Sequence, residues 1–404
     1  MRITFLMIAS LDRPAGRRYF PISHALARRG HRVRILALHP DLPSCLQRRF
    51  VQDGVEVWYV GQMHARKAAS VPTRFGPLDL LRVLASSTLG MIWGVICSPA
   101  DVYHLGKPQP VNGMAALLAV RLLRRRPFYV DCDDDEVRGN RLPAAWQRAV
   151  FGFWQWLLPR LAAGVTVNTR HLATELARAG VAPVALVPNG VDAGSFLAPP
   201  VATLKALRVA LGFANRPVVA YAGSLALQNH PVDLLIDAFA EVAAADDQQG
   251  RLWHGGGEDL PLLRDLAARF GLRDRVYFTG QLDYRAVPAY LALADLSVDP
   301  VRDDLVARAR SPLKLVESMA LGVPVITGGV GDRAELLNHG AAGMLVRPGD
   351  AAALAEAIIS LLRDTPRRQA LAVAGRERAG VYVWERLAET WETIYASSGI
   401  DLKE

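Results

Sequence analysis

Short apolar runs rich in valine, isoleucine and aromatic residues alternate along this chain with alanine-, leucine- and arginine-rich stretches of helical period. Such alternation is typical of parallel sheets whose faces are covered by helices. In the first half, the apolar runs predict strands over Arg2–Ala9, Arg32–Leu38, Val55–Val60, Asp101–Leu105, Pro127–Asp131, Val165–Asn168 and Val184–Val187. In the second half, they predict strands over Pro217–Ala222, Arg251–His254, Arg275–Phe278, Leu296–Asp299, Val323–Thr327 and Gly343–Val346. The sequence therefore predicts an α/β fold of two doubly wound, Rossmann-like domains.

The alternation of strands and helices stops in a stretch that lacks periodicity and contains Pro199-Pro200. We therefore predict an N-terminal domain over residues 1–193, a hinge over 194–205 and a C-terminal domain over 206–383. A last helix, roughly from Trp384 to Ser397 within the segment 384–404, is expected to cross back to the first domain. Ligands of α/β sheets bind at the carboxyl ends of the strands, so we expect the two domains to face each other across a ligand-binding cleft.

Composition and charge narrow the function classes. The 404 residues are 51% apolar and 21% charged, which excludes a disordered, collagenous or coiled-coil protein. The net charge is +8, and residues 1–200 hold 25 basic and 13 acidic residues (+12), whereas the remainder holds 22 and 26 (−4). The basic excess therefore lies in the first half. Only five of the 47 basic residues are lysines, so a lysine inside a motif is a departure from the arginine default.

Targeting and redox signals are weak. Ile3–Ala9 is too short for the apolar core of a secretory signal and is followed at once by charged residues, so it reads as a strand. The long uncharged run between Arg82 and Asp101 contains three consecutive hydroxyl residues and two glycines, and we predict a buried helix there rather than a membrane span. Three widely spaced cysteines argue against a disulfide framework and fit a reducing compartment.

The most informative segment is SPLKLVESMALGVPVI, residues 311–326. Ser311 is expected to cap a helix that ends at Gly322. Lys314 and Glu317 then project from one face of its first two turns. A helix N-terminus and a lysine attract phosphate, while a carboxylate one turn further on accepts hydrogen bonds from sugar hydroxyls. The pair suits a nucleoside diphosphate with its ribose; the alternative is an ordinary exposed ion pair between the two side chains.

At this point the sequence resembles the retaining glycosyltransferases of family 4, which have the GT-B fold. The resemblance extends over nearly the whole chain. It rests on the ordered segments ALARRGHRV (25–33), DVYHLGKPQP (101–110), VPNGVD (187–192), YAGS (221–224), VDLLIDAFA (232–240), HGGGEDLPLLRDLA (254–267), VYFTG (276–280), VPAYLALADLSVDP (287–300), Ser-Pro-x-Lys-x-x-Glu (311–317) and GAAGMLVRPGD (340–350).

The resemblance implies transfer of a sugar from a nucleotide-diphosphate donor, held mainly by the second domain without a metal or other cofactor, to an acceptor on the first. Lys314 would contact the diphosphate and Glu317 the ribose. Gly16, in the first loop, would approach the donor from the opposite domain. The other donor-side candidates are Gly223, Ser224, Asn229, Gly280, Gln281, Leu282, Ser311 and Leu315.

The chain also departs from the family pattern. The usual acidic residue eight positions before Glu317 is replaced by Ala309. Ser224 stands where an arginine is usual, and Asn229 and His230 fall where a phosphate-binding lysine is expected. These departures concern the donor pocket, so the resemblance does not identify the sugar.

Where many members carry a histidine after the fifth strand, this chain has the acidic run DCDDDE, residues 131–136. The run has three interpretations. Asp131 and Asp133 match an Asp-x-Asp metal motif, although that motif belongs to a different glycosyltransferase fold. The run is alternatively a solvated acidic turn before a helix. Our preferred interpretation places Asp133 or Asp134 at the floor of the cleft, where it orients or deprotonates the acceptor hydroxyl.

Two further features belong to the first domain. His104 and Lys107 follow the fourth strand and are acceptor-side candidates, the alternatives being a core histidine and a surface lysine. The stretch 144–164 interleaves five aromatic residues with arginines. Either it is an aromatic helix packed into the core, or it rests on an anionic membrane that presents a lipid-linked acceptor.

The sequence thus predicts a nucleotide-sugar-dependent glycosyltransferase of cell-envelope or exopolysaccharide synthesis, with Lys314, Glu317 and Asp133 as catalytic residues. Its acceptor is a glycan or a lipid-linked glycan, and its place is the cytoplasm, at the inner face of the plasma membrane. The alternatives are an epimerase or phosphorylase on the same fold and a scaffold that binds sugar nucleotides without turnover. Nucleic-acid binding ranks last, because the basic half carries no recognised motif.

Overall fold

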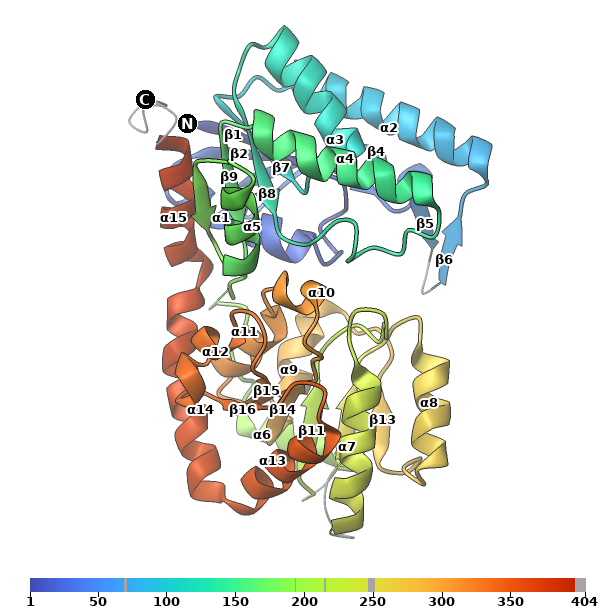
Figure 1. Cartoon of the computed structure of the whole chain (residues 1–404), viewed down its shortest axis with the longest axis vertical. Coiled ribbons are helices and arrows are strands. Elements are labelled where there is room, and N and C mark those ends of the chain that lie inside the picture. Colours follow the sequence, from blue (N-terminus) through green and yellow to red (C-terminus); the bar gives the residue numbers. More distant parts are fainter. Residues whose placement is uncertain (69–70, 193, 214–215, 246–250, 397–404) are drawn as a thin grey trace. The chain divides into compact units, whose positions relative to one another are not determined.

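The computed structural model describes residues 1–68, 71–192, 194–213, 216–245 and 251–396, and divides into two compact units (Figure 1). Unit 1 comprises Met1–Pro188 and the C-terminal stretch that begins at Trp384. Unit 2 comprises Asn189–Val383. The division therefore falls at Pro188, and the described residues of the predicted hinge 194–205 lie inside unit 2, where Val201 already begins a helix.

Unit 1 is built on an eight-stranded sheet of order β10-β9-β8-β7-β1-β2-β4-β3 within the described residues. Neighbouring strands are parallel except β3 and β4. The strands are β1 (Arg2–Met7), β2 (Arg32–His39), β3 (Arg49–Gln52), β4 (Val55–Gln62), β7 (Val102–Gly106), β8 (Phe128–Cys132), β9 (Gly164–Val167) and β10 (Val184–Leu186). A separate antiparallel pair is formed by β5 (Ala65–Ala68) and β6 (Val71–Arg74).

Helices cover this sheet. They are α1 (Gly16–Arg28), the 3-10 turn η1 (Leu42–Ser44), α2 (Pro77–Cys97), α3 (Pro110–Ala115), the π-helix η2 (Ala116–Leu123), α4 (Ala145–Leu161), α5 (Arg170–Arg178) and α15 (Trp384–Ala396). Helix α15 packs against α1, and its buried Trp391 and Tyr395 share one hydrophobic cluster with Ile3 and Phe5 of β1. The last helix thus belongs to the core of unit 1, while residues 397–404 of the predicted C-terminal segment lie outside the described residues.

Helix α2 corrects one prediction. The sequence predicts a buried helix here, but within α2 only Ser87, Met91, Gly94 and Val95 are buried. The helix lies close against β4, because the Val60 carbonyl leaves no room for a side chain at Gly90. A narrow stripe that includes Gly90 and Gly94 therefore makes the contact, and Leu78, Leu81, Leu89 and Trp93 stay exposed. Among the described residues, α2 is the one helix long and apolar enough to cross a membrane.

Unit 2 is built on a parallel six-stranded sheet of order β13-β12-β11-β14-β15-β16 within the described residues. The strands are β11 (Val218–Tyr221), β12 (Arg251–His254), β13 (Val276–Phe278), β14 (Leu296–Asp299), β15 (Val325–Gly328) and β16 (Met344–Val346). Successive residues of β11 face opposite sides, so Val219 joins one hydrophobic cluster and Val218 and Ala220 join another.

The helices of unit 2 are α6 (Val201–Ala210), α7 (Val232–Ala245), α8 (Leu260–Arg269), η3 (Tyr284–Ala286), α9 (Val287–Leu291), α10 (Leu305–Arg308), α11 (Leu313–Ala320), α12 (Arg333–Leu336), η4 (Asn338–Gly340), α13 (Ala351–Arg363), α14 (Thr365–Ala379) and η5 (Gly380–Tyr382). Each of the thirteen strands predicted from the sequence is present, and the prediction of two doubly wound sheets is confirmed. The strands β3, β5 and β6 were not predicted.

Candidate functional site

The strand order of unit 2 defines a place for a ligand. The chain runs outward from β11 to β12 and β13, then returns to the other side of β11 with β14. Ligands of open α/β sheets bind at the carboxyl ends of the strands where the order reverses in this way. Tyr221 ends β11 and Asp299 ends β14, and the side chain of Lys314 reaches both from helix α11.

Lys314 is held by specific contacts at this place. Its Nζ lies 3.0 Å from Asp299 Oδ1 and donates to the Tyr221 hydroxyl at 3.1 Å. Burial alone would lower the pKa of Lys314, but Asp299 and Tyr221 outweigh it and raise that pKa. Burial would likewise raise the pKa of Asp299, but Lys314 and Arg333 lower it to about 2. Both groups are therefore charged at neutral pH.

Glu317 lies one turn further along α11 and is only 4% exposed. Its Oε1 accepts a hydrogen bond from the Tyr284 hydroxyl at 2.7 Å. Lys314 and Glu317 thus have different partners, one on β14 and one on η3, rather than forming a solvent-exposed pair. Tyr284 fixes the direction of the carboxylate, which prepares it to accept hydrogen bonds from a ligand.

The loop after β11 runs directly over Lys314. A Cβ atom at Gly223 would lie 2.6 Å from the Tyr221 hydroxyl and 3.0 Å from Lys314 Nζ. Only glycine lets the loop backbone approach the amine this closely. Ser224 follows as an exposed residue whose carbonyl accepts from the Tyr221 hydroxyl at 3.1 Å.

Arg310 is a second cationic residue that contacts the loop after β11. Its NH1 donates to the Asn229 carbonyl at 3.1 Å. Beside it, burial and the charges of Lys314 and Arg310 hold the pKa of His230 well below its usual value, so this imidazole is neutral. The positions where the family lysine is expected are thus occupied by uncharged groups, with Arg310 adjoining them.

Other donor-side candidates have different surroundings. The Ser311 hydroxyl accepts from the Asn189 backbone amide at 3.0 Å and does not cap α11, whose N-cap residue is Pro312. Leu315 is fully buried in the hydrophobic core, and Ala309 is buried as well. Gly280 has a left-handed φ of 73° that turns the chain after β13, Gln281 is exposed, and Leu282 packs against the core.

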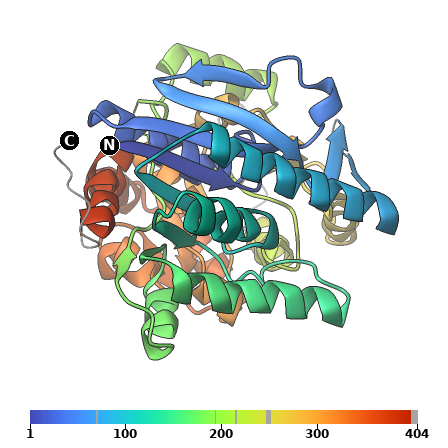
Figure 2. The same cartoon turned by 90° about the horizontal axis from the view of Figure 1, so that it is seen from above.

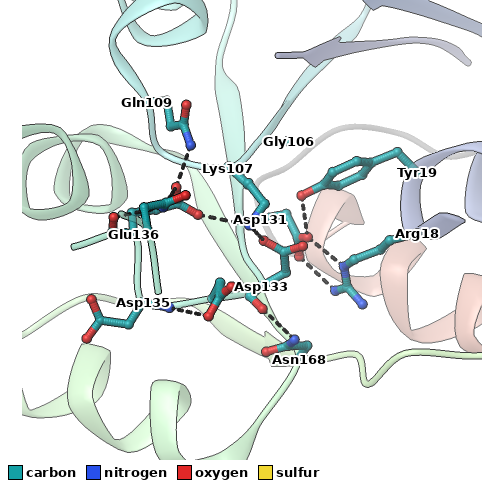
Figure 3. A network of polar contacts seen from close by, with 12 residues as sticks. Arg18, Tyr19, Gly106, Lys107, Gln109, Asp131, Asp133, Asp135, Glu136 and Asn168 are labelled. Carbon is teal, nitrogen blue, oxygen red and sulfur yellow. Dashed lines mark hydrogen bonds and ion pairs between the residues drawn. The ribbon is translucent and has the colours of Figure 1, made fainter. Parts of the chain in front are cut away.

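Unit 1 has its own reversal of strand order, between β1 and β7. The loop after β1 leads to Gly16, where the Leu11 carbonyl leaves no room for a side chain. Tight backbone packing within unit 1 therefore accounts for this glycine. In the next turn, Arg18 forms two hydrogen bonds with Asp131, at 2.7 and 2.8 Å (Figure 3). The pair is buried, with 3% and 0% of the side chains exposed.

Lys107 follows β7 with a left-handed φ of 75° and is mostly buried. Its Nζ lies 3.0 Å from both Asp133 Oδ1 and Glu136 Oε1 (Figure 3). Burial would lower the pKa of Lys107, but these carboxylates raise it well above its usual value. Burial also raises the pKa of Glu136. Lys107 therefore links the acidic run, through two ion pairs, to the end of β7, where the strand order of unit 1 reverses.

The structure argues against two of the three interpretations of the run DCDDDE. Asp131, Asp135 and Glu136 are buried, so the run is not a solvated turn. Asp131 accepts from Arg18, Tyr19 and Thr166, which occupies the oxygens that a metal ion would need. Asp133 is 12% exposed, and its carbonyl accepts from Asn168 at 2.6 Å. Asp134 accepts from the backbone amide of Asp135. Asp133 and Asp134 directly follow β8, which ends at Cys132.

His104 is a core residue rather than an acceptor contact. Its side chain is fully buried, stacks with Phe5 and lies beside Trp391. Its Nδ1 lies 2.9 Å from the Tyr395 hydroxyl of α15. The aromatic pocket leaves this imidazole no access to a ligand.

The burial of His104 predicts a pH dependence of stability. Burial holds its pKa well below the ordinary 6.5, so its contribution is complete above pH 6.5 and is lost as the pH falls below it. We expect the free energy of unfolding of unit 1 to decline by up to about 1.4 kcal/mol per pH unit there. Thermal melts between pH 5 and 8 of the protein and of His104→Gln test this; the slope should flatten in the variant and persist in His24→Gln.

Several site residues carried no sequence signal strong enough to find them. Asp299 and Tyr221 contact Lys314, and Arg333 pairs with Asp299, but in the sequence they look like ordinary strand-end or helix residues. Tyr284 and Arg310 belong to short loops or turns. For Tyr221 and Asp299, the position at a strand end was a hint of a role, and that position has a meaning for ligand binding only once the strand order is known.

Known proteins provide an independent comparison. Residues 15–190 match the family described as Glycosyl transferase 4-like domain, and residues 216–364 match Glycosyl transferases group 1. A GDP-mannose-dependent alpha-(1-6)-phosphatidylinositol monomannoside mannosyltransferase of Mycobacterium tuberculosis is 32% identical over 52% of this chain and 53% of its own. The 2-deoxystreptamine glucosyltransferase of Streptomyces kanamyceticus is 29% identical over 74% of this chain and 72% of its own.

The match spans about half the length of the mycobacterial relatives. Among solved structures, sucrose-phosphate synthase from Thermosynechococcus elongatus superposes with a TM-score of 0.76 at 20% identity, over 98% of this chain and 99% of that one. That likeness concerns the fold. With both family matches in sequence order and both sheets in the expected topology, the chain belongs to the group 1, family 4-like glycosyltransferases of GT-B fold.

Proposed function

We propose that this chain transfers a sugar from a nucleotide-diphosphate donor to a glycan or lipid-linked acceptor, with retention of configuration. The observation that carries the proposal is Lys314, which is charged, mostly buried and placed at the strand-order reversal of unit 2. The family relationship supports nucleotide-sugar chemistry, since the mycobacterial relative is named as GDP-mannose-dependent.

In this mechanism unit 2 binds the donor. Lys314 and the N-terminus of α11 stabilise the negative charge that develops on the departing diphosphate. Asp299 and Tyr221 fix the ammonium before the donor arrives, so little reorganisation is needed during the reaction. Glu317, oriented by Tyr284, accepts hydrogen bonds from the ribose. No metal takes part in the proposed mechanism.

On unit 1, Asp133 orients the acceptor hydroxyl or accepts its proton, with Lys107 as its ion-pair partner and Asp134 beside it. The relatives' names include phosphatidylinositol monomannoside and 2-deoxystreptamine. Cell-envelope or exopolysaccharide synthesis at the inner face of the plasma membrane fits the first of these, and the basic charge of residues 1–200 suits anionic lipid.

Titration calorimetry against UDP- and GDP-sugars, followed by transfer and hydrolysis assays on the sugars that bind, tests the proposal. We expect one nucleotide sugar to bind and to be turned over with an α-linked product. Binding without turnover on any acceptor would favour the scaffold, a candidate supported by the buried Ala309 where the family carries a carboxylate. Absence of binding across the panel would contradict both.

Arg310 supplies a specific prediction within this function. If it substitutes for the missing loop lysine, Arg310→Gln should raise the donor KM about tenfold or more, because a charge-assisted contact is worth about 1.5–3 kcal/mol. Arg310→Lys should recover part of the loss. Arg308→Gln is the matched control, since that exposed arginine pairs with Asp303 at the surface. Equal KM values for the two glutamine variants would exclude the role.

A further inference from the structure

One surface of unit 1 is unusually apolar. Among the described residues, twelve of the twenty-three exposed large hydrophobic side chains lie on α2, α3, η2 and α4. They are Leu78, Leu81, Leu89, Trp93, Met114, Leu118, Leu122, Leu123, Trp146, Val150, Phe153 and Trp156. We call this set the apolar face. Such a concentration marks an interaction site, whereas scattered single residues do not.

The helices that carry the apolar face are neighbours. Helix α2 packs against α3 and η2, and α3 packs against α4. Figure 2 shows them as the blue, teal and green helices of unit 1. Gly113 of α3 has no room for a side chain, because the ring of Trp154 on α4 lies where a Cβ would be, at 2.7 Å. The exposed side chains therefore belong to one packed layer of helices.

The apolar face is not the ordinary outer side of amphipathic helices. A helix on a soluble domain turns charged residues outward, but α2 exposes Leu78, Leu81, Leu89 and Trp93. Helix α4 likewise buries Trp154 and exposes Trp146, Phe153 and Trp156. Three tryptophans at 53–63% exposure are costly in water and typical of the boundary between lipid headgroups and acyl chains.

The charged residues around the apolar face indicate what kind of partner it binds. The helices and the turn after η2 carry Arg82, Arg121, Arg124, Arg125, Arg126, Arg148 and Arg160, against the single acidic residue Asp79. All of these arginines except Arg124 are classed as exposed, and the guanidinium of Arg160 stacks on Trp156 at 4.7 Å. A second copy of the chain would bring arginines against arginines. An anionic bilayer provides both phosphates for the arginines and an apolar layer for the rings.

We propose that the apolar face docks on an anionic bilayer, with its leucine and tryptophan side chains inserted at the headgroup boundary and its arginines on lipid phosphates. The inference rests on the proposed function in one respect: that function explains why the enzyme would bind a membrane, namely to reach a lipid-linked acceptor. It adds to that function a defined set of inserting side chains. Insertion distinguishes it from attraction by net charge alone, which salt would abolish.

Flotation of the full chain with vesicles of phosphatidylglycerol and phosphatidylcholine tests the contact. We expect the protein to float with these vesicles at 0.1 M salt and to keep a substantial bound fraction at 0.5 M salt. The variant Leu81→Ser/Trp93→Ser/Trp156→Ser should lower the partition coefficient at least tenfold at both salt concentrations. These three side chains are exposed, so the substitutions leave the core intact.

The matched control is Val209→Ser/Leu262→Ser/Val373→Ser, which removes three similarly exposed apolar side chains from unit 2. It should change the partition coefficient less than twofold. Failure of the unaltered protein to float, or equal partition of the two triple variants, would overturn the proposal. UDP and GDP binding, measured by calorimetry, should be the same in the unaltered protein and in both triple variants. If none of the three bound nucleotide, that result would count against the proposed function rather than against the membrane contact.

Discussion

Replacing Lys314 with glutamine is expected to lower the rate of sugar transfer by about 10²–10³-fold, the range observed when one preorganised transition-state contact is removed. The reason is its position at the reversal of strand order in unit 2, where Asp299 and Tyr221 hold the ammonium at 3.0 and 3.1 Å. A loss confined to kcat would show that the charge acts on the departing diphosphate. A loss confined to KM would show that it binds the donor in the ground state.

The control for this prediction must separate chemistry from folding. Removing Lys314 leaves the buried Asp299 paired with Arg333 alone, at 3.1 Å, which destabilises unit 2. Thermal melts of the Lys314→Gln protein measure this cost, and its turnover is compared with that of the unaltered protein well below both melting temperatures. Lys205→Gln, at an exposed position of α6, should behave as the unaltered protein does. Normal turnover in a folded Lys314→Gln protein would contradict the assignment.

Replacing Asp131 with asparagine is expected to destabilise unit 1 by about 3–5 kcal/mol, because it leaves the buried guanidinium of Arg18 without its counter-charge. Arg18 is 3% exposed and also donates to the Val187 carbonyl at 2.9 Å, so it cannot turn outward to water without losing that contact. For a unit of this size, the change corresponds to a fall in Tm of roughly 6–20 °C.

A surface pair within the same sheet provides the comparison. Arg2 and Asp101 form a bidentate pair with 50% and 28% of their side chains exposed. Asp101→Asn should therefore cost less than about 1 kcal/mol. Calorimetric melts of the two variants, with nucleotide binding as a check on unit 2, measure the difference. Similar melting temperatures for Asp131→Asn and Asp101→Asn would contradict the prediction that the buried Arg18–Asp131 pair contributes more to the stability of unit 1 than the surface pair.

Local patterns were sufficient to predict much of the fold. The strands predicted from apolar runs are present because a parallel strand is buried on both faces, which leaves a continuous apolar signal. The short antiparallel strands β3, β5 and β6 lack that signal, since they lie at the sheet edge or in a separate pair. The interval 194–205 reads as a hinge because prolines break periodicity, although its second half begins α6.

The candidate site was predictable only in part. Lys314 and Glu317 stand out because helix spacing places them together. Their partners do not, because Tyr221 precedes Lys314 by 93 positions and Tyr284 precedes Glu317 by 33. His104 and Leu315 were predicted at the site from their place in motifs, yet packing buries both. A motif identifies a position in the chain, and burial depends on the elements that cover it.

The sequence by itself determined the two doubly wound sheets, the family and the lysine on which the proposed chemistry depends, since periodicity and motif spacing are local properties of the chain. Only the tertiary structure decided which groups Lys314 and Asp131 meet, that His104 is enclosed by aromatic rings, and that α2 keeps an apolar side exposed. These outcomes depend on strand order and on the few residues that bring helices against a sheet. Both bring together side chains that lie far apart in the sequence.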